Sequence, residues 1–264
     1  MENNSKHIVL KTENLSIGYC EKKGTTFIAK DLNINLEKGK LVCLLGKNGI
    51  GKSTLLRTLT KTQPKLGGEI WIENKKLYDI KPPTLAKKMS LVLTEKIPES
   101  QLTVFELIAL GRQPYTNWLG KLSDNDYEKI EYAMELVQIK YLSFKKNYEL
   151  SDGQLQKVMI ARALAQDTDI IILDEPTAHL DLHHKIEVFK ILQGLIQKTN
   201  KTILLSTHEV NLALQLADEL WLMTPDKFVT GTTDTLIQSK DLENLFPANQ
   251  ISFNPELKQF ILKK

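Results

Sequence analysis

Long hydrophobic runs are missing from this sequence, and cysteine is scarce. No stretch of the 264 residues approaches the roughly 18 consecutive apolar residues of a membrane-spanning helix, and the opening "MENNSKHIVLKTEN" lacks the apolar segment of a secretory signal. We therefore expect neither a membrane span nor a signal peptide, so any role at a membrane depends on a partner. The two cysteines are Cys20 and Cys43, and Cys43 lies in the apolar run "LVCLL". A reduced thiol packs well there, which favours a reducing, cytosolic setting.

Blocks of like charge are absent as well. The chain has 35 Lys and Arg residues against 32 Asp and Glu residues, and the two signs are interspersed. This pattern predicts an ordinary mixed-charge surface and no nucleic-acid partner. No internal repeat, coiled-coil heptad run or low-complexity linker is evident. The length suits one compact domain, with room for an insert.

What the sequence does contain is a series of short apolar runs rich in β-branched residues. Several are apolar on both faces, as buried parallel strands are, and helical patterns such as Val188, Leu192, Leu195 and Ile196 alternate with them. This order predicts an α/β core. Upstream, "NLSIGY" and "GEIWIE" alternate like half-exposed antiparallel strands. The apolar runs lie at 41–45, 89–93, 170–173, 202–206 and 219–223.

The middle of the chain has helix signals and almost no strand signal. Thr103 and Glu106 form a capping box before an apolar segment, and Ser123 precedes apolar residues at helical spacing. We therefore expect one domain over residues 1–264. Its catalytic core and β subdomain would occupy about 1–94 and 166–264, and a helical subdomain about 95–165.

A glycine-rich loop, "GKNGIGKST", follows the run "LVCLL" and precedes a helical segment. Its residues fit G-x-x-x-x-G-K-[ST] in the strand–loop–helix context that this motif requires. Such a loop turns backbone N–H groups toward phosphates, while Lys52 would reach the outer phosphates and the Ser53 hydroxyl would bind Mg²⁺. The predicted phosphate-binding residues are Gly46, Lys47, Asn48, Gly49, Gly51, Lys52, Ser53 and Thr54.

Two carboxylates end the run "IIILDEP", where α/β sheets present their ligands. Asp174 would bind Mg²⁺ and Glu175 would orient the attacking water. An ordinary acidic loop after a core strand is the alternative, and the upstream glycine-rich loop argues against it. His208 likewise follows a strand, where we expect it to contact the γ-phosphate; a structural histidine is the alternative.

A second polar stretch, "LSDGQ" at 150–154, begins another predicted helix. Ser151 and Gln154 form an S-x-x-Q capping box, so the helix N-terminus could receive an anion. Taken alone, the stretch would more simply be a helix cap. Together with the other motifs, it indicates a second phosphate contact.

Taken together, these motifs resemble the ATP-binding subunits of ABC transporters. The glycine-rich loop matches Walker A, "LSDGQ" the signature, "IIILDE" Walker B, "AHLD" at 178–181 the D-loop, and His208 the switch histidine. The resemblance implies a P-loop NTPase core with a parallel sheet, an antiparallel β subdomain and a helical insert. It also implies hydrolysis of MgATP in which Glu175, His208 and Lys52 act.

In that family two chains pair head to tail, so the resemblance implies that each ATP lies between the Walker A loop of one chain and the signature helix of the other. The implied contacts to the partner's nucleotide come from Ser151, Gly153, Gln154 and Asp181. Tyr19, in "LSIGY", matches the aromatic residue that stacks on adenine; an aromatic residue buried in the core is the alternative.

Within the family, "LTVFELIALGRQPYTNWLG" resembles the importers of ferric siderophores, haem and cobalamin, which use a permease fed by a substrate-binding protein. The resemblance implies a peripheral position on the cytoplasmic face of the membrane. Tyr115 and Trp118 would dock on the permease, or would merely cap the helical insert. The alternative function is a soluble ABC-type ATPase of iron–sulfur cluster assembly or DNA maintenance. A non-hydrolysing ATP-binding regulator conflicts with the presence of Glu175 and His208.

The chain departs from the family pattern at two places. Thr94, followed by Glu95, stands where the family has a glutamine that contacts Mg²⁺, and the Thr94 hydroxyl could still reach the metal through water. Asp152 replaces the first glycine of the usual "LSGGQ". We expect Asp152 to point toward solvent or a basic partner, while Gly153 leaves room for the phosphate.

Overall fold

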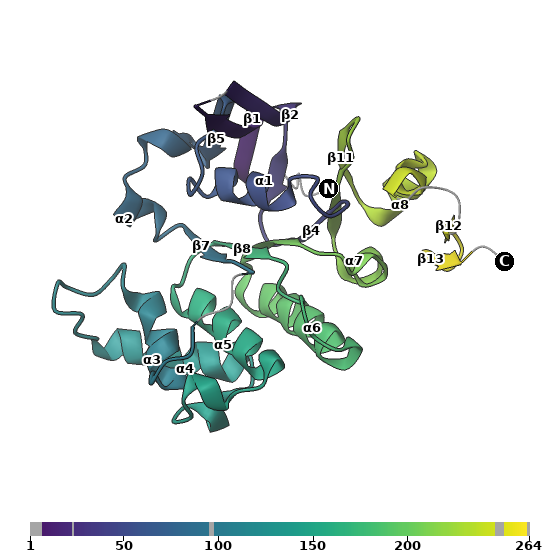
Figure 1. Cartoon of the computed structure of the whole chain (residues 1–264). Helices are drawn as coiled ribbons and strands as arrows, with labels where there is room; N and C mark the ends of the chain where they lie inside the picture. The colour runs from purple at the N-terminus through teal and green to yellow at the C-terminus, as the bar shows by residue number, and fades with distance from the viewer. Residues whose placement is uncertain (1–6, 23, 95–97, 246–250, 263–264) are drawn as a thin grey trace, which may run out of the picture. The chain divides into compact units, whose positions relative to one another are not determined.

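The computed structural model describes residues 7–22, 24–94, 98–245 and 251–262 (Figure 1). The chain divides into two compact units. We call Met1–Lys81 with Thr202–Lys264 the core unit, and Pro82–Lys201 the helical unit. None of the helices in the described ranges is long and apolar enough to cross a membrane.

Parallel strands form the centre of the core unit. Strand β4 (Leu41–Leu45) pairs in parallel with β9 (Thr202–Ser206) on one side and β10 (Glu219–Met223) on the other. Every residue of the three strands is buried. The expected parallel strands are therefore confirmed here, and an edge strand that the sequence did not reveal, β11 (Phe228–Gly231), pairs antiparallel to β10.

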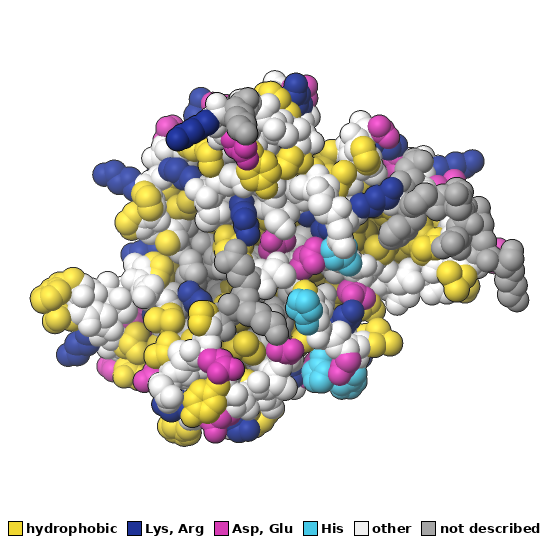
Figure 2. Space-filling model, in the orientation of Figure 1, with side chains coloured by type: hydrophobic (Ala, Val, Ile, Leu, Met, Phe, Trp, Pro, Cys, Tyr) yellow, Lys and Arg dark blue, Asp and Glu magenta, His cyan; other side chains and the backbone are white. Residues whose placement is uncertain are grey.

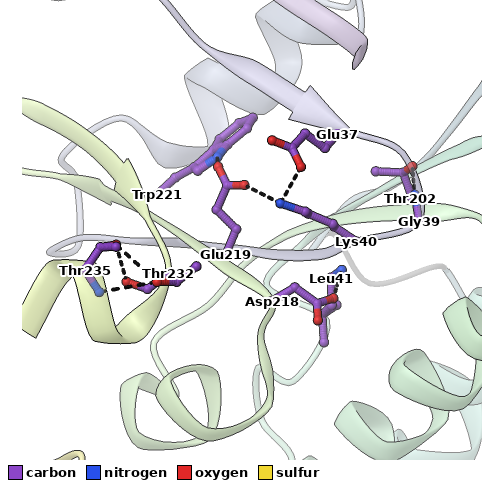
Figure 3. A network of polar contacts seen from close by, with 10 residues as sticks. All are labelled: Glu37, Gly39, Lys40, Leu41, Thr202, Asp218, Glu219, Trp221, Thr232 and Thr235. Carbon is purple, nitrogen blue, oxygen red and sulfur yellow. Dashed lines mark hydrogen bonds and ion pairs between the residues drawn. The ribbon is translucent and has the colours of Figure 1, made fainter. Parts of the chain in front are cut away.

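A polar network fixes the beginning of β4 (Figure 3). The Lys40 Nζ lies 2.6 Å from Glu37 and 3.4 Å from Glu219, and the Trp221 Nε1 donates a hydrogen bond to Glu219 at 3.0 Å. Burial lowers the pKa of Lys40, but the hydrogen bond to Glu37 and the attraction of Glu219 outweigh burial and raise it overall. The Leu41 N–H donates to Asp218 at 2.7 Å. These contacts hold the strand that leads into the glycine-rich loop.

Antiparallel strands form a further part of the core unit. Strand β1 (Ile8–Glu21) pairs antiparallel with β5 (Gly67–Ile72) and β2 (Gly24–Leu32), which confirms the antiparallel β region. A hairpin of β12 (Ile251–Asn254) and β13 (Gln259–Leu262) was not predicted. The remaining elements of this unit are β3 (Asn35–Glu37), β6 (Lys75–Lys76), α1 (Lys52–Leu59), α7 (Val210–Leu216) and α8 (Thr233–Gln238), with 3-10 turns at Leu77–Asp79 and Asp241–Leu245.

The helical unit carries its own parallel strand pair, β7 (Met89–Val92) and β8 (Ile170–Asp174). Its longest helix, α6 (Leu182–Thr199), buries Val188, Leu192 and Leu195 as the apolar spacing predicts. The other elements are α2 (Pro82–Leu85), α3 (Val104–Ala109), α4 (Asp124–Leu136) and α5 (Asp152–Ala165), with 3-10 turns at Leu110–Arg112, Lys140–Leu142 and Asn147–Glu149.

Side-chain caps define where these helices begin. The Thr103 hydroxyl accepts a hydrogen bond from the Glu106 N–H, and the Glu106 carboxylate accepts one from the Thr103 N–H, so the predicted capping box is confirmed. Ser123 caps α4 in the same way. Both α3 and α4 pack against α5. That packing holds the helix that carries the signature motif.

Candidate functional site

The glycine-rich loop joins β4 to α1 and has no room for larger residues at two of its glycines. A Cβ atom at Gly46 would lie 2.6 Å from the Met223 carbonyl oxygen, and one at Gly51 would lie 2.2 Å from the Ile28 side chain. Gly51 also has a φ of +111°, and Gly49 has a φ of +76°, a region that glycine adopts readily. The glycines of the motif are therefore needed for the shape of the loop itself.

Lys52 turns its side chain back over this loop. It is only 5% exposed, and its Nζ donates to the Gly46 carbonyl oxygen at 3.0 Å. The same Nζ lies 3.4 Å from the His208 Nε2. Lys52 and His208 were predicted from motifs far apart in the sequence, and the core unit brings their nitrogen atoms together. A lysine ammonium that donates to a backbone carbonyl oxygen here can transfer that hydrogen bond to a phosphate.

The first turn of α1 has no side-chain cap among the residues that the structure describes. Gly51 is its N-cap residue, no side chain caps it, and the first turn contains no acidic residue. The N-terminus of an α-helix carries unsatisfied N–H groups and a partial positive charge, so an anion is favoured there. Ser53 lies in this first turn, as the predicted magnesium role requires. Lys47, Asn48 and Gly49 are exposed.

Tyr19 lies beside the same helix. Its hydroxyl and the Thr54 hydroxyl are 2.8 Å apart, and Tyr19 is 46% exposed. This exposure rules out the alternative of a tyrosine buried in the core. The ring is thus available at the phosphate loop, and its stacking on adenine stays a prediction.

In the helical unit, the two predicted acidic residues lie at the end of β8, where Asp174 is the last residue of the strand and Glu175 follows it. Asp174 is 3% exposed, and Glu175 has a φ of +48°. Left-handed backbone is uncommon for a residue with a side chain, and such conformations cluster at functional sites. The Thr94 hydroxyl donates to the Asp174 carbonyl oxygen at 2.9 Å and so ties the end of β7 to that of β8. Glu95 lies outside the described residues.

Magnesium suits the predicted donor set, because Mg²⁺ prefers carboxylate and hydroxyl oxygen ligands. Asp174 supplies a carboxylate, and Ser53 and Thr94 supply hydroxyls. The Thr94 proton is engaged with a backbone carbonyl, which leaves the lone pairs of its oxygen for a metal or for water. Within the described ranges, no group of three or more His, Cys, Asp or Glu side chains forms a metal site. Mg²⁺ bound by Asp174 would therefore need hydroxyl, water or ligand oxygen atoms as well.

The signature motif forms the predicted capping box at the start of α5. The Ser151 hydroxyl accepts from the Gln154 N–H at 3.3 Å, and the Gln154 side chain accepts from the Ser151 N–H at 3.1 Å. Asp152 is exposed, as expected, and Gly153 is buried. A Cβ at Gly153 would lie 2.8 Å from the His184 ring, so this glycine also has a packing role.

Asp181, in the D-loop, is the N-cap of α6. Its carboxylate accepts hydrogen bonds from the His184 N–H at 2.9 Å and from the His184 Nδ1 at 2.8 Å. These bonds hold the pKa of Asp181 below its usual value. Sequence reasoning missed His184, although the D-x-x-H spacing of a helix cap was visible in "DLHH". Asp181 thus orients the ring that packs on Gly153.

The loop between α3 and α4 exposes hydrophobic side chains at its outer end (Figure 2). Trp118 is 91% exposed and Leu119 is 67% exposed. Tyr115 behaves differently, because its ring stacks under the Arg112 guanidinium at 3.9 Å. Of the two aromatic residues singled out in the sequence, Tyr115 therefore packs against the helical unit, and Trp118 projects from it.

The comparisons with known proteins agree with these motifs. Residues 29–178 match the ABC transporter family. The chain is 38% identical over 97% of its length to an uncharacterised ABC transporter ATP-binding protein of Methanocaldococcus jannaschii, covering 87% of that protein. It is 35% identical to the probable siderophore transport system ATP-binding protein YusV of Bacillus subtilis, over 93% of this chain and 89% of the relative. It is 38% identical to the iron(3+)-hydroxamate import ATP-binding protein FhuC of the same bacterium, over 79% and 76%.

Solved structures point the same way. A metal-chelate type ABC transporter in an inward-facing conformation matches with a TM-score of 0.78 and 27% identity, over 96% of this chain and 95% of that one. A dimeric bacterial ABC transporter cassette matches with a TM-score of 0.72 and 26% identity, over 84% and 98%. The phosphate loop, the strand-end carboxylates and the capped signature helix thus occur in a chain that belongs to the ABC transporter family, as an ATP-binding subunit that hydrolyses ATP.

Proposed function

We propose that the chain powers the uptake of an iron(III)–siderophore complex through a membrane permease. The observation that carries this proposal is the near full-length similarity to proteins named for siderophore and iron(3+)-hydroxamate transport. Haem and cobalamin belong to the same predicted class of cargo. None of the relatives described above is named for iron–sulfur cluster assembly, so that alternative has no support.

The proposed roles follow from the chemistry of each residue. Lys52 and the N–H groups of the glycine-rich loop bind the phosphates, and His208 contacts the γ-phosphate. Ser53, Asp174 and Thr94 would hold Mg²⁺, which would supply positive charge to offset the charge that develops on the phosphates. Glu175 orients the water that attacks the γ-phosphate. The 2.9 Å contact between Thr94 and the Asp174 carbonyl supports a shared role of these two residues.

The signature residues would act on the nucleotide of a second copy. We propose a head-to-tail dimer in which Ser151, Gly153 and Gln154 of one chain, with Asp181, face the ATP bound by Lys52 of the other. The match to a dimeric cassette supports this arrangement. The Ser151 hydroxyl accepts one hydrogen bond from the chain and still has a proton to donate to a phosphate.

Membrane attachment would come from a permease at the cytoplasmic face. The exposed Trp118 suits a contact with a permease helix, because an exposed aromatic residue offers a large apolar surface. A substrate-binding protein outside the membrane would deliver the iron complex to that permease. The chain itself would then hydrolyse ATP without touching the cargo.

Uptake of radiolabelled iron tests this proposal. Cells that lack the gene should lose uptake of an iron(III)–hydroxamate, and the parent chain should restore it, whereas Glu175→Gln should not. Trp118→Ala should restore it poorly while retaining ATP binding. Tyr141→Ala removes an aromatic residue that is 73% exposed elsewhere on the helical unit and serves as the matched control. Normal uptake of every iron(III)–siderophore complex tested, together with lost uptake of haem or cobalamin, would reassign the cargo.

A further inference from the structure

Helix α7 begins directly after the predicted switch histidine. It runs from Val210 to Leu216, and the Val210 N–H donates to the His208 carbonyl oxygen at 2.9 Å. In the described part of the chain no side chain caps its N-terminus. Isolated helices of fewer than roughly 12–15 residues are marginal in water, so α7 depends on packing for its shape. Contacts that hold its first turn therefore also hold the backbone of His208.

The C-terminal hairpin supplies such a contact. The Phe260 N–H of β13 donates to the Asn211 Oδ1 at 2.9 Å, and the Asn211 Nδ2 donates to the Phe260 carbonyl oxygen at 3.4 Å. One side-chain amide thus pairs with both backbone groups of a strand residue, as a neighbouring antiparallel strand would. Strand β13 also lies against α7. The hairpin is therefore joined to α7 only three residues after His208.

The hairpin needs this support as much as α7 does. A single two-stranded hairpin is at best marginally stable in water, and every residue of β12 and β13 is at least partly exposed. The Phe253 and Phe260 rings pack on each other with their centroids 5.1 Å apart. The Lys258 Nζ lies 2.6 Å from the Asp234 carboxylate and ties the turn of the hairpin to α8. The hairpin and the first turn of α7 therefore stabilise each other.

The two ends of α7 are held in different ways. Near its C-terminus, Ala213 and Leu214 are buried, and the Thr233 hydroxyl donates to the Leu214 carbonyl oxygen at 3.0 Å. At its N-terminus, Val210 is only half-buried and Asn211 is exposed. Burial thus fixes the far end of the helix, whereas the end next to His208 relies on hydrogen bonds such as those of Asn211.

We propose that Asn211 is a positioning residue for ATP hydrolysis, through which the C-terminal hairpin holds His208 in place. The amide pair fixes the first turn of α7, and with it the backbone that carries the His208 ring, whose Nε2 lies 3.4 Å from the Lys52 Nζ. The inference rests on the proposed contact of His208 with the γ-phosphate. It concerns the rate of hydrolysis more than the binding of ATP, because Lys52 and the glycine-rich loop stay unaltered.

Asn211→Ala tests this in the full-length chain. Alanine removes both hydrogen bonds and favours a helix more than asparagine does, so a loss would not come from weaker helix propensity. We expect kcat for ATP hydrolysis at 25 °C to fall about 3- to 10-fold while KM for ATP changes less than about twofold. The control is Gln215→Ala, at an exposed residue of the same helix, which should leave both constants unchanged.

A second variant reaches the same contact from the other side. Phe253→Ala removes the ring that packs on Phe260, so it weakens the hairpin and leaves the sequence of α7 unaltered. We expect kcat to fall in the same direction. Hydrogen exchange reports whether the hairpin has been released, because the Phe260 N–H should exchange faster in both variants while β4 and β9 keep their protection.

Two results would overturn the inference. One is parental kcat in variants whose Phe260 N–H exchanges faster, and the other is unchanged exchange of that N–H in Asn211→Ala. His208→Ala, measured alongside, separates this inference from the proposed function. If His208→Ala is inactive and Asn211→Ala is fully active, only the role of Asn211 fails. If His208→Ala hydrolyses ATP at the parental rate, the role of His208 fails first.

Discussion

The helices α1 and α5 begin in opposite ways. At α1, the N-cap is Gly51 in a left-handed conformation, no side chain caps the helix, and no acidic residue lies in the first turn. At α5, Ser151 and Gln154 cap each other, and Asp152 adds a negative charge to the first turn. The two helices follow the two loops that the sequence marks as phosphate-binding.

This difference shows how one chain can use two phosphate-binding loops. The first turn of α1 has no side-chain cap, and the N-terminus of a helix carries a partial positive charge, so an anionic ligand would stabilise it. The first turn of α5 is stabilised by its own side chains and keeps its shape before any nucleotide arrives. We infer that the N-terminus of α1 binds the nucleotide of its own chain. The N-terminus of α5 would then be a preformed surface that contacts the nucleotide bound by a partner chain.

The largest expected effect belongs to the α1 loop. Lys52→Ala removes the buried ammonium that now bonds the Gly46 carbonyl oxygen. We expect ATP binding to weaken by about 2–5 kcal/mol, which is roughly 30- to 4,000-fold in the dissociation constant, because the phosphates lose a charge-assisted partner. Isothermal titration calorimetry measures this. The control is Lys38→Ala, which changes an exposed lysine. If the dissociation constant of Lys52→Ala for ATP stayed within threefold of the parent value, ATP binding at α1 would not depend on Lys52.

A smaller effect is expected where the signature motif packs on α6. Gly153→Ala should destabilise the protein by about 1–3 kcal/mol, because the new Cβ would lie 2.8 Å from the His184 ring. Urea unfolding measures the loss. In the double variant Gly153→Ala/His184→Ala the clash is removed, so part of the stability should return. Equal losses in the single and double variants would mean that Gly153 is constrained by something other than His184.

The cap of α5 should contribute less. Ser151→Ala removes the hydroxyl that accepts the Gln154 N–H, and we expect a loss of about 0.5–2 kcal/mol in the free energy of unfolding. At α1 no side chain caps the helix, so no such substitution exists there. An unchanged stability of Ser151→Ala would remove the contrast between the two helices.

The smallest effect is expected at Asp152. Asp152→Asn keeps the shape of the side chain and removes the charge that favours the first turn of a helix, which costs about 0.3–1 kcal/mol at low salt and less at high salt. ATP hydrolysis should stay intact or rise modestly, because Asp152 is exposed. Steady-state ATPase rates with the permease present check this. A dead variant would give the carboxylate a direct catalytic or interface role.

The sequence predicted most accurately those features that depend on neighbouring residues. The run "LVCLL" is a buried parallel strand because both of its faces are apolar, and β4 begins and ends with it. The capping boxes at Thr103 and Ser151 are equally local, since each needs only two side chains three residues apart. Such features leave a pattern that can be seen without a structure.

Contacts between distant segments could not be predicted in the same way. The pairing of Tyr19 with Thr54 joins a strand to a helix 35 residues later, and the packing of His184 on Gly153 joins two helices. A pocket in the helical unit, lined among others by Thr94, Met159 and Glu175, likewise combines three segments that meet only after folding. None of these contacts has a spacing rule, so tertiary packing alone reveals them. The C-terminal hairpin of β12 and β13 was missed as well.

The central claim is that Lys52 and Ser151 of one chain act on different ATP molecules. Mixing a Lys52→Ala chain with a Ser151→Arg chain tests it most directly, because a head-to-tail heterodimer contains one composite site free of both substitutions. We predict that the ATPase activity of the mixture, with heterodimer formation confirmed, clearly exceeds the sum of the two variants measured separately. Activity that never rises above that sum would contradict the shared site.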